Sequence, residues 1–132
     1  MNRLTGKIES IETSGSLSVV NLSVGSANMK SIVTETPETA EYLEVGKNVD
    51  VLFKETEVII GKGTEHAISL RNRLICKIEK IEKGDLLGKL TLKHEEGTIM
   101  SVITANAVHN LGLEIGETVT ALIKTNEIML AG

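Results

Sequence analysis

The stretch Asn72-Arg73-Leu74, followed by Lys77-Ile78-Glu79, decides the fold because the chain contains it twice. Seventy residues earlier the sequence reads Asn2-Arg3-Leu4 and then Lys7-Ile8-Glu9. The two copies can be aligned to their ends without a gap, and most core positions keep an aliphatic residue. Two copies indicate a pair of similar domains, since a solenoid needs at least about three repeats.

Each copy alternates apolar and polar residues in short runs separated by glycine-containing turns, a pattern typical of strands. The expected order is three strands, a short helix and two strands. We place the helices between Thr36 and Leu43 and at 106–111, and we interpret the break in alternation at Ile11 as a bulge. Five short strands in this order predict an all-β fold with one short helix per repeat, built as two tandem five-stranded barrels of the oligonucleotide/oligosaccharide-binding (OB) type. The expected strands are 4–12, 17–24, 28–34, 49–53 and 57–60 in a first domain at 1–62, and 73–82, 86–94, 98–104, 118–123 and 127–130 in a second at 68–132.

Composition limits the partners that this chain can have. Apolar residues make up 41% of it, enough for a core, but Tyr42 and Phe53 are its only aromatic residues, so the core must be aliphatic. A formal charge of -4 and the lack of aromatic platforms disfavour nucleic acid as a partner. The sequence has no apolar run near the ~20 residues that span a bilayer, and no leader peptide opens it. With Cys76 as its one cysteine, we expect a soluble cytoplasmic protein without a membrane partner.

Two polar stretches could bind an oxyanion together. Ser69-Leu70-Arg71-Asn72 offers a hydroxyl, a planar guanidinium fork and a carboxamide, and Lys30-Ser31 adds an ammonium and a second hydroxyl. The alternative interpretation is that Lys30 and Arg71 are solvated surface cations and Ser31 is an edge hydroxyl. Weaker candidates for the same role are Thr34, Ser101, Thr104, Lys54 and Lys124.

Catalysis and cation binding find no support in the sequence. We find no pairing of a nucleophile with a base. His66, His94 and His109 are scattered without the spacing of metal ligands. We therefore expect neither an enzyme nor a protein with a metal site or cofactor.

The opening of the second copy, Ser69-Leu70-Arg71-Asn72-Arg73-Leu74 with Lys77-Ile78, resembles the opening of molybdate-binding Mop domains. The rest of that copy agrees in spacing, from Ser101-Val102-Ile103-Thr104 through Leu111-Gly112-Leu113 to Glu127-Ile128-Met129-Leu130. The first copy fits more loosely. The whole chain thus resembles a di-domain molbindin, a tandem pair of Mop (TOBE-type) barrels.

This resemblance implies a small protein that binds molybdate, and usually tungstate, and stores or buffers the oxyanion without transforming it. Six domains assemble with threefold symmetry in that family and hold ligands between domains, so two domains per chain imply a homotrimer. The family's binding residues correspond to Ser69 and Arg71 in one copy, and to Lys30 and Ser31 in the other. We add the neighbouring Asn72 as a candidate ligand-binding residue.

The two copies are unequal in these residues. The first copy begins Met1-Asn2-Arg3 and has no counterpart of Ser69 or Arg71, whereas the second has Met100 in the place of Lys30. We therefore predict one full site, where the second copy's opening meets Lys30, either within a chain or between neighbouring chains. The reverse pairing, Asn2 with Met100-Ser101, should be poor or vacant.

Two other functions remain open from the sequence. Similar barrels also serve as oxyanion-sensing regulatory modules that act on a partner protein, but 132 residues leave no room for a fused partner domain, which favours the stand-alone interpretation. A plain interaction or nucleic-acid-binding barrel is the other alternative, and the low aromatic content and negative charge argue against it.

Overall fold

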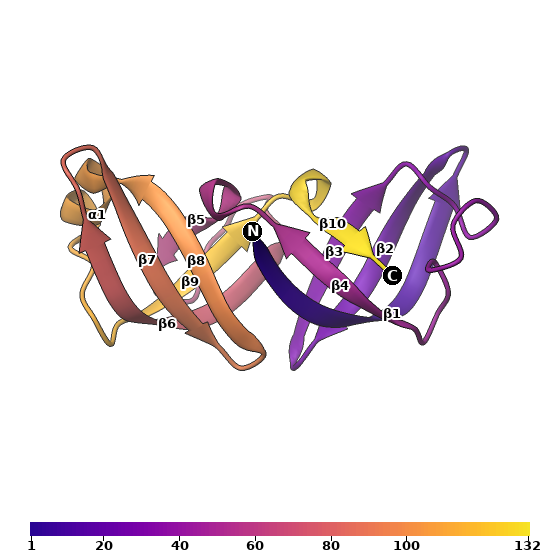
Figure 1. The fold of residues 1–132 in the computed structure, drawn as a ribbon, viewed down its shortest axis with the longest axis horizontal. Helices are drawn as coiled ribbons and strands as arrows, with labels where there is room; N and C mark the ends of the chain where they lie inside the picture. Colours follow the sequence, from indigo (N-terminus) through magenta and orange to yellow (C-terminus); the bar gives the residue numbers. More distant parts are fainter.

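The computed structural model describes all residues from Met1 to Gly132 and has two antiparallel five-stranded sheets (Figure 1). The expectation of an all-β fold is confirmed. The elements in chain order are β1 (Asn2–Ser14), β2 (Leu17–Val24), β3 (Ala27–Val33), β4 (Asn48–Phe53), the 3-10 turn η1 (Glu55–Glu57), β5 (Ile59–Lys62), β6 (Asn72–Lys83), β7 (Leu87–His94), β8 (Gly97–Thr104), α1 (Ala105–Leu111), β9 (Thr118–Ile123), the 3-10 turn η2 (Thr125–Glu127) and β10 (Met129–Ala131).

The longest strands, β1 and β6, each carry a bulge at matching positions. Pairing of β1 with β2 shifts register between Ile8 and Ser10, and pairing of β6 with β7 shifts between Ile78 and Lys80. The bulge predicted at Ile11 therefore exists but lies slightly earlier. An extra residue bends a strand and increases its twist, which lets each sheet curl.

The two copies exchange their last strands. The sheet orders are β10-β4-β1-β2-β3 and β5-β9-β6-β7-β8. After β4, η1 redirects the chain so that β5 pairs with β9, and after β9, η2 sends β10 back to β4. Strand pairing thus crosses between the predicted domains at 1–62 and 68–132, because each copy completes the sheet of the other.

Buried serine hydroxyls hold the edges of each curled sheet together. Ser31 Oγ donates to the Ile128 carbonyl at 2.9 Å, and Ser101 Oγ donates to the Val58 carbonyl at 3.0 Å. Both serines are fully buried. Each barrel is therefore closed by side-chain hydrogen bonds to the exchanged segment and not by a further backbone ladder.

A single apolar core runs through both copies. It joins 25 buried residues, and most of them are Leu, Ile and Val, as the composition predicted. Phe53 is its one phenylalanine and is completely buried. Because the core is continuous and the last strands are exchanged, neither copy buries its apolar surface alone.

Only the second of the two predicted helices forms. In α1, Thr104 Oγ1 accepts from the Ala107 N–H at 3.0 Å, and Gly112 ends the helix at a φ of 60°. The helix predicted from Thr36 is instead a turn, in which the Thr39 and Ala40 N–H groups both donate to the Thr36 carbonyl. Tyr42 stands where α1 has its terminal glycine, and so short a segment gains too few bonds to offset helix nucleation.

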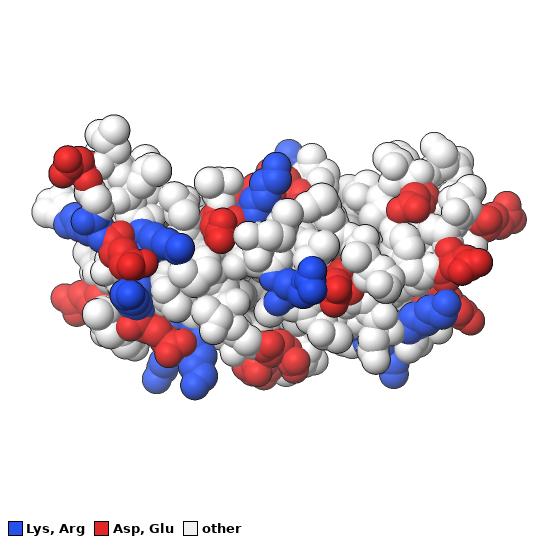
Figure 2. All heavy atoms as spheres, viewed as in Figure 1, with Lys and Arg blue, Asp and Glu red and all other residues white.

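Charges of both signs are interspersed over the face shown in Figure 2, without a continuous basic area. Attraction of an anion there must come from local groups, since net charge mainly affects the rate of encounter. None of the helices is both long and apolar enough to span a membrane.

Candidate functional site

The side chain of Asn72 joins the opening of the second copy to the edge strand of the first. Asn72 is fully buried at the start of β6. Its Nδ2 donates to the Lys30 carbonyl at 2.9 Å, and its Oδ1 accepts from the Lys30 N–H at 2.6 Å. The carboxamide thus pairs with β3 as another strand's backbone would. The structure therefore brings Asn72 and Lys30 together within one chain.

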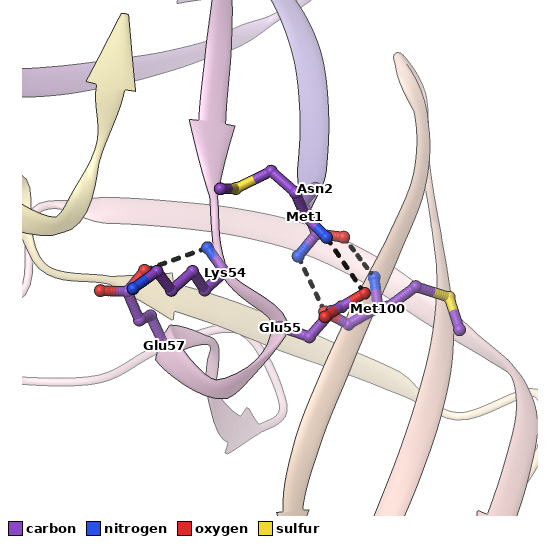
Figure 3. A network of polar contacts seen from close by, with 6 residues as sticks. All are labelled: Met1, Asn2, Lys54, Glu55, Glu57 and Met100. Atoms are coloured by element: carbon purple, nitrogen blue, oxygen red, sulfur yellow. Dashed lines mark hydrogen bonds and ion pairs between the residues drawn. The ribbon is translucent and has the colours of Figure 1, made fainter.

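The same pairing occurs at the pseudo-equivalent position (Figure 3). Asn2 Nδ2 donates to the Met100 carbonyl at 2.9 Å, and Asn2 Oδ1 accepts from the Met100 N–H at 2.8 Å. The two asparagines are thus a shared scaffold feature of the repeat. The two positions differ in the side chains that lie beside Asn72 and beside Asn2.

Beside Asn72, two cations line one open pocket of about 330 Å³, which we call the anion pocket. Lys30 comes from β3 and Arg71 from the residue before β6. The other side chains are acidic, amide and apolar, so the full lining is Glu9, Asn21, Leu22, Asn28, Met29, Lys30 and Arg71. Two convergent cations in one pocket are the feature that an oxyanion site requires.

Both cations keep donors free for a ligand. Lys30 Nζ donates to Asn21 Oδ1 at 2.5 Å, which uses one of its three protons. Arg71 donates through Nη2 to the Ile68 carbonyl at 2.6 Å and through Nε to the Ser69 carbonyl at 3.3 Å. These bonds fold the connector around the guanidinium and leave its remaining N–H groups unpaired.

A carboxylate also lines the anion pocket. Glu9, on the solvent side of β1, accepts from Ser23 Oγ at 2.8 Å. Its negative charge opposes a bound anion, although solvent screens an exposed group strongly. With Lys30 and Arg71, the charges lining the pocket sum to about one positive charge.

Other predicted site residues lie outside this pocket. Ser69 is exposed, and its hydroxyl makes no hydrogen bond. The Ser31 hydroxyl is fully buried and already donates to the Ile128 carbonyl. In this single chain the structure therefore groups Lys30, Arg71 and Asn72, and it gives Ser31 a role in closing the barrel.

The weaker candidates are dispersed over the molecule. Thr34 borders an apolar groove beside β10, and Thr104 caps α1. Ser101 closes the second barrel, as described above. Lys54 and Lys124 precede η1 and η2 and are exposed.

The two 3-10 turns bring a pair of carboxylates together. A hydrogen bond and the negative charge of Glu57 raise the pKa of Glu127, and the nearby Lys54 and Lys124 oppose that shift. These two lysines thus lie near the carboxylate pair and outside the anion pocket. Elsewhere, burial raises the pKa of the Cys76 thiol to about 12, so it is a packing group and not a nucleophile.

The pseudo-equivalent of the anion pocket has no comparable cations. Met1 stands in the place of Arg71, and Met100 in that of Lys30. The ammonium of Met1 pairs with Glu55 at 3.3 Å (Figure 3). We call the side chains of Asn72 and Asn2, each bonded to the backbone of an edge strand, the asparagine clamps. The two clamps are similar, but only the one at Asn72 lies beside a pocket lined by cationic side chains.

The residues that sequence reasoning missed are Glu9, Asn21 and Asn28. A signal for Asn21 was present, because a two-residue turn at Gly25-Ser26 sets the hairpin register that places Asn21 opposite Lys30. The position of Glu9 could not be read in this way, since it depends on the bulge in β1.

Comparison with known proteins agrees with this fold. The model of the TOBE domain matches residues 1–60 and 68–130. Molybdenum transport protein ModE of Herbaspirillum seropedicae is 26% identical over 133 residues, which are 98% of this chain and 49% of that protein, so the chain spans about half its length. Molybdenum-pterin-binding protein 1 of Clostridium pasteurianum is 34% identical over 65 residues, 48% of this chain and 96% of that protein.

A solved structure extends the likeness to nearly the whole chain. The structure of the cytoplasmic molybdate-binding protein ModG with molybdate bound superposes with a TM-score of 0.88 and 27% identity. The match covers 98% of this chain and 94% of that one. The family match to both copies of the repeat and the superposition on ModG indicate the same tandem architecture. The chain therefore belongs to the TOBE domain family, as a tandem pair of the molbindin type.

Proposed function

We propose that this chain binds molybdate or tungstate in the cytoplasm and stores or buffers the oxyanion without changing it chemically. The observation that carries this proposal is the Asn72–Lys30 pairing, because it brings Arg71 and Lys30 to one pocket. The likeness to ModG over 98% of the chain supports the choice of ligand.

The attraction between molybdate and this chain comes from groups that lie in the pocket itself. Molybdate is a tetrahedral dianion at neutral pH, and charge-assisted donors bind it more strongly than neutral ones. Lys30 on β3 and Arg71 just before β6 belong to the same chain, so the pocket is formed before the ligand arrives. An acidic protein can therefore bind an anion, because the two pocket cations outweigh the one pocket carboxylate, Glu9, and more distant carboxylates are screened.

The pocket is open, and this supports a homotrimer as the binding form. Only two cations of one chain line the cavity, and Ser69, two residues before Arg71, is exposed outside it. A neighbouring chain would supply further donors and exclude water. We propose three chains with one strong site per chain, since only the asparagine clamp at Asn72 has cationic side chains beside it.

Titration calorimetry with molybdate, tungstate, sulfate and phosphate tests this function. We expect molybdate or tungstate to bind more tightly than sulfate and phosphate. Lys30→Met, which copies the residue of the other repeat, should weaken that binding at least about tenfold because a charged hydrogen bond is lost. Lys89→Met removes an exposed lysine of β7 and serves as the control. Equal binding by wild type and Lys30→Met would exclude the pocket as the site.

The length of the ModE relative favours a second candidate function. Because this chain matches about half of that protein, a similar tandem pair can form part of a larger one. The chain could then sense the oxyanion and act on a partner protein. Fractionation of cell extracts distinguishes the two functions: a storage protein carries much of the cellular molybdenum, whereas a sensor carries little and changes partners when molybdate is added.

A further inference from the structure

A row of three polar side chains crosses the first sheet and ends at the anion pocket. Ser10 on β1 is the register partner of Asn21 on β2, and Asn21 is the register partner of Lys30 on β3. Asn21 Nδ2 donates to Ser10 Oγ at 2.9 Å, and Lys30 Nζ donates to Asn21 Oδ1 at 2.5 Å. We call these three residues the polar row.

The chemistry of the row fixes the orientation of its central amide. A lysine ammonium can only donate, so it requires the amide oxygen of Asn21. The amide NH₂ group is then directed to Ser10, whose hydroxyl accepts. Both the oxygen and the nitrogen of the Asn21 amide are thus hydrogen-bonded, and the Lys30 ammonium is held where its side chain lines the anion pocket.

The bulge in β1 determines which residue anchors the row. Before the shift Ile8 pairs with Leu22, so a regular strand would place Glu9 opposite Asn21. The bulge puts Ser10 there instead, and Glu9 binds Ser23. A neutral hydroxyl therefore takes the place of a carboxylate that would draw the amide and the ammonium away from an anion.

We infer that Asn21, anchored by Ser10, is a positioning residue that holds the Lys30 ammonium in the anion pocket. This inference rests on the proposed function, since it concerns how the same pocket holds its oxyanion. Asn21 accepts only one of the three ammonium protons and leaves two for the ligand. A lysine side chain has high rotamer entropy, so holding it in advance reduces the ordering that binding requires.

The second repeat provides an internal control for this inference. Its register partners at the same three positions are Lys80, Thr91 and Met100. No side-chain hydrogen bond links them, and Lys80 pairs with Glu82 at 3.3 Å. The amide is thus present in the copy that has a lysine to orient, and absent in the copy that does not.

A structural role for Asn21 would predict a different outcome. Asn21 is only half-buried, and its two hydrogen bonds lie on the solvent side of the sheet. Removing the amide should therefore leave folding nearly unchanged. Its effect should appear in the mobility of Lys30 and in ligand affinity.

The test replaces Asn21 by the residue of the other repeat. Asn21→Thr should weaken molybdate binding about fivefold, the ratio that corresponds to one net hydrogen bond. The matched control, Thr91→Asn, should leave affinity unchanged. In the unliganded protein, nuclear magnetic resonance order parameters of the Lys30 ammonium should fall in Asn21→Thr, and less so in Ser10→Ala.

Each result has a distinct meaning. Weaker binding together with a more mobile Lys30 ammonium, at an unchanged melting temperature, supports the inference. Wild-type affinity or an unchanged order parameter in Asn21→Thr would overturn it, while the proposed function would stand if wild type binds molybdate. A wild-type protein that binds neither molybdate nor tungstate would overturn both.

Discussion

Replacing Asn72 by alanine should affect stability and binding together, whereas replacing Asn2 should affect stability alone. Each side chain makes two hydrogen bonds to the backbone of an edge strand, at 2.6 and 2.9 Å for Asn72 and at 2.8 and 2.9 Å for Asn2. Both side chains are buried, with residue exposures of 0% and 4%. The two substitutions are therefore matched in structural cost.

The magnitude follows from those bonds. Each hydrogen bond contributes about 1 kcal/mol net, and the partly buried N–H and carbonyl groups that lose a partner cost about as much again. We therefore expect Asn72→Ala and Asn2→Ala each to lower the free energy of unfolding by about 2–4 kcal/mol. Only Asn72 holds Lys30 in register with Arg71, so only Asn72→Ala should weaken molybdate binding, by about tenfold or more.

Two measurements check this prediction. Urea unfolding monitored by circular dichroism gives the loss of stability, and calorimetry at a temperature where both variants are folded gives the affinity. Equal loss of binding in both variants would refute the assignment of the site to the Asn72 end. A stability loss below about 0.5 kcal/mol in both would refute the structural role of the clamps.

Three further predictions concern closure of the barrels, affinity for molybdate and the pH dependence of stability. Ser31→Ala and Ser101→Ala should each lower the free energy of unfolding by about 1–3 kcal/mol, measured by urea unfolding, because each leaves a carbonyl of the exchanged segment without its partner. Glu9→Gln should tighten molybdate binding by about threefold in calorimetry by removing a screened charge from the pocket, while Glu79→Gln in the other copy should not. Glu57 raises the pKa of Glu127 in the folded state, so the contribution of that group to stability is complete at low pH and is lost as pH rises through the raised value. Glu127→Gln should therefore stabilise the protein at pH 7 and not at pH 4, as unfolding curves at the two pH values will show.

The sequence predicted the architecture well, for a reason that lies in the repeat. Strands with one buried side, such as β2 with Val20 and Leu22 inward, carry a period of two that the core requires. The same copy-to-copy alignment predicted that the opening of the second copy meets Lys30. The side chain that makes this contact is Asn72, which the repeat keeps as Asn2.

Strand exchange could not be predicted, because it leaves the local pattern unchanged. Ile60 of β5 pairs opposite Ala121, and Leu130 of β10 pairs opposite Val51. In both cases an aliphatic residue meets an aliphatic residue, as it would without exchange. Pattern alone therefore does not distinguish a strand that stays from one that crosses.

The sequence also could not predict which way an individual polar side chain points. A serine beside a lysine on an edge strand suggested two ligand donors, but the Ser31 hydroxyl is buried and donates to a carbonyl. The neighbouring Asn21, across the hairpin, contacts Lys30 instead. Which face a side chain occupies depends on the bulge and register, and these are set by the assembled sheet.

The number of oxyanions bound per chain tests the central claim most directly. Equilibrium dialysis against molybdate, followed by elemental analysis of molybdenum and protein, measures this ratio in the assembled protein. One full pocket per chain, formed by Lys30 and Arg71, predicts one strongly bound molybdate per chain and none in Lys30→Met. Two equivalent strong sites per chain, or a ratio that Lys30→Met leaves unchanged, would contradict the account.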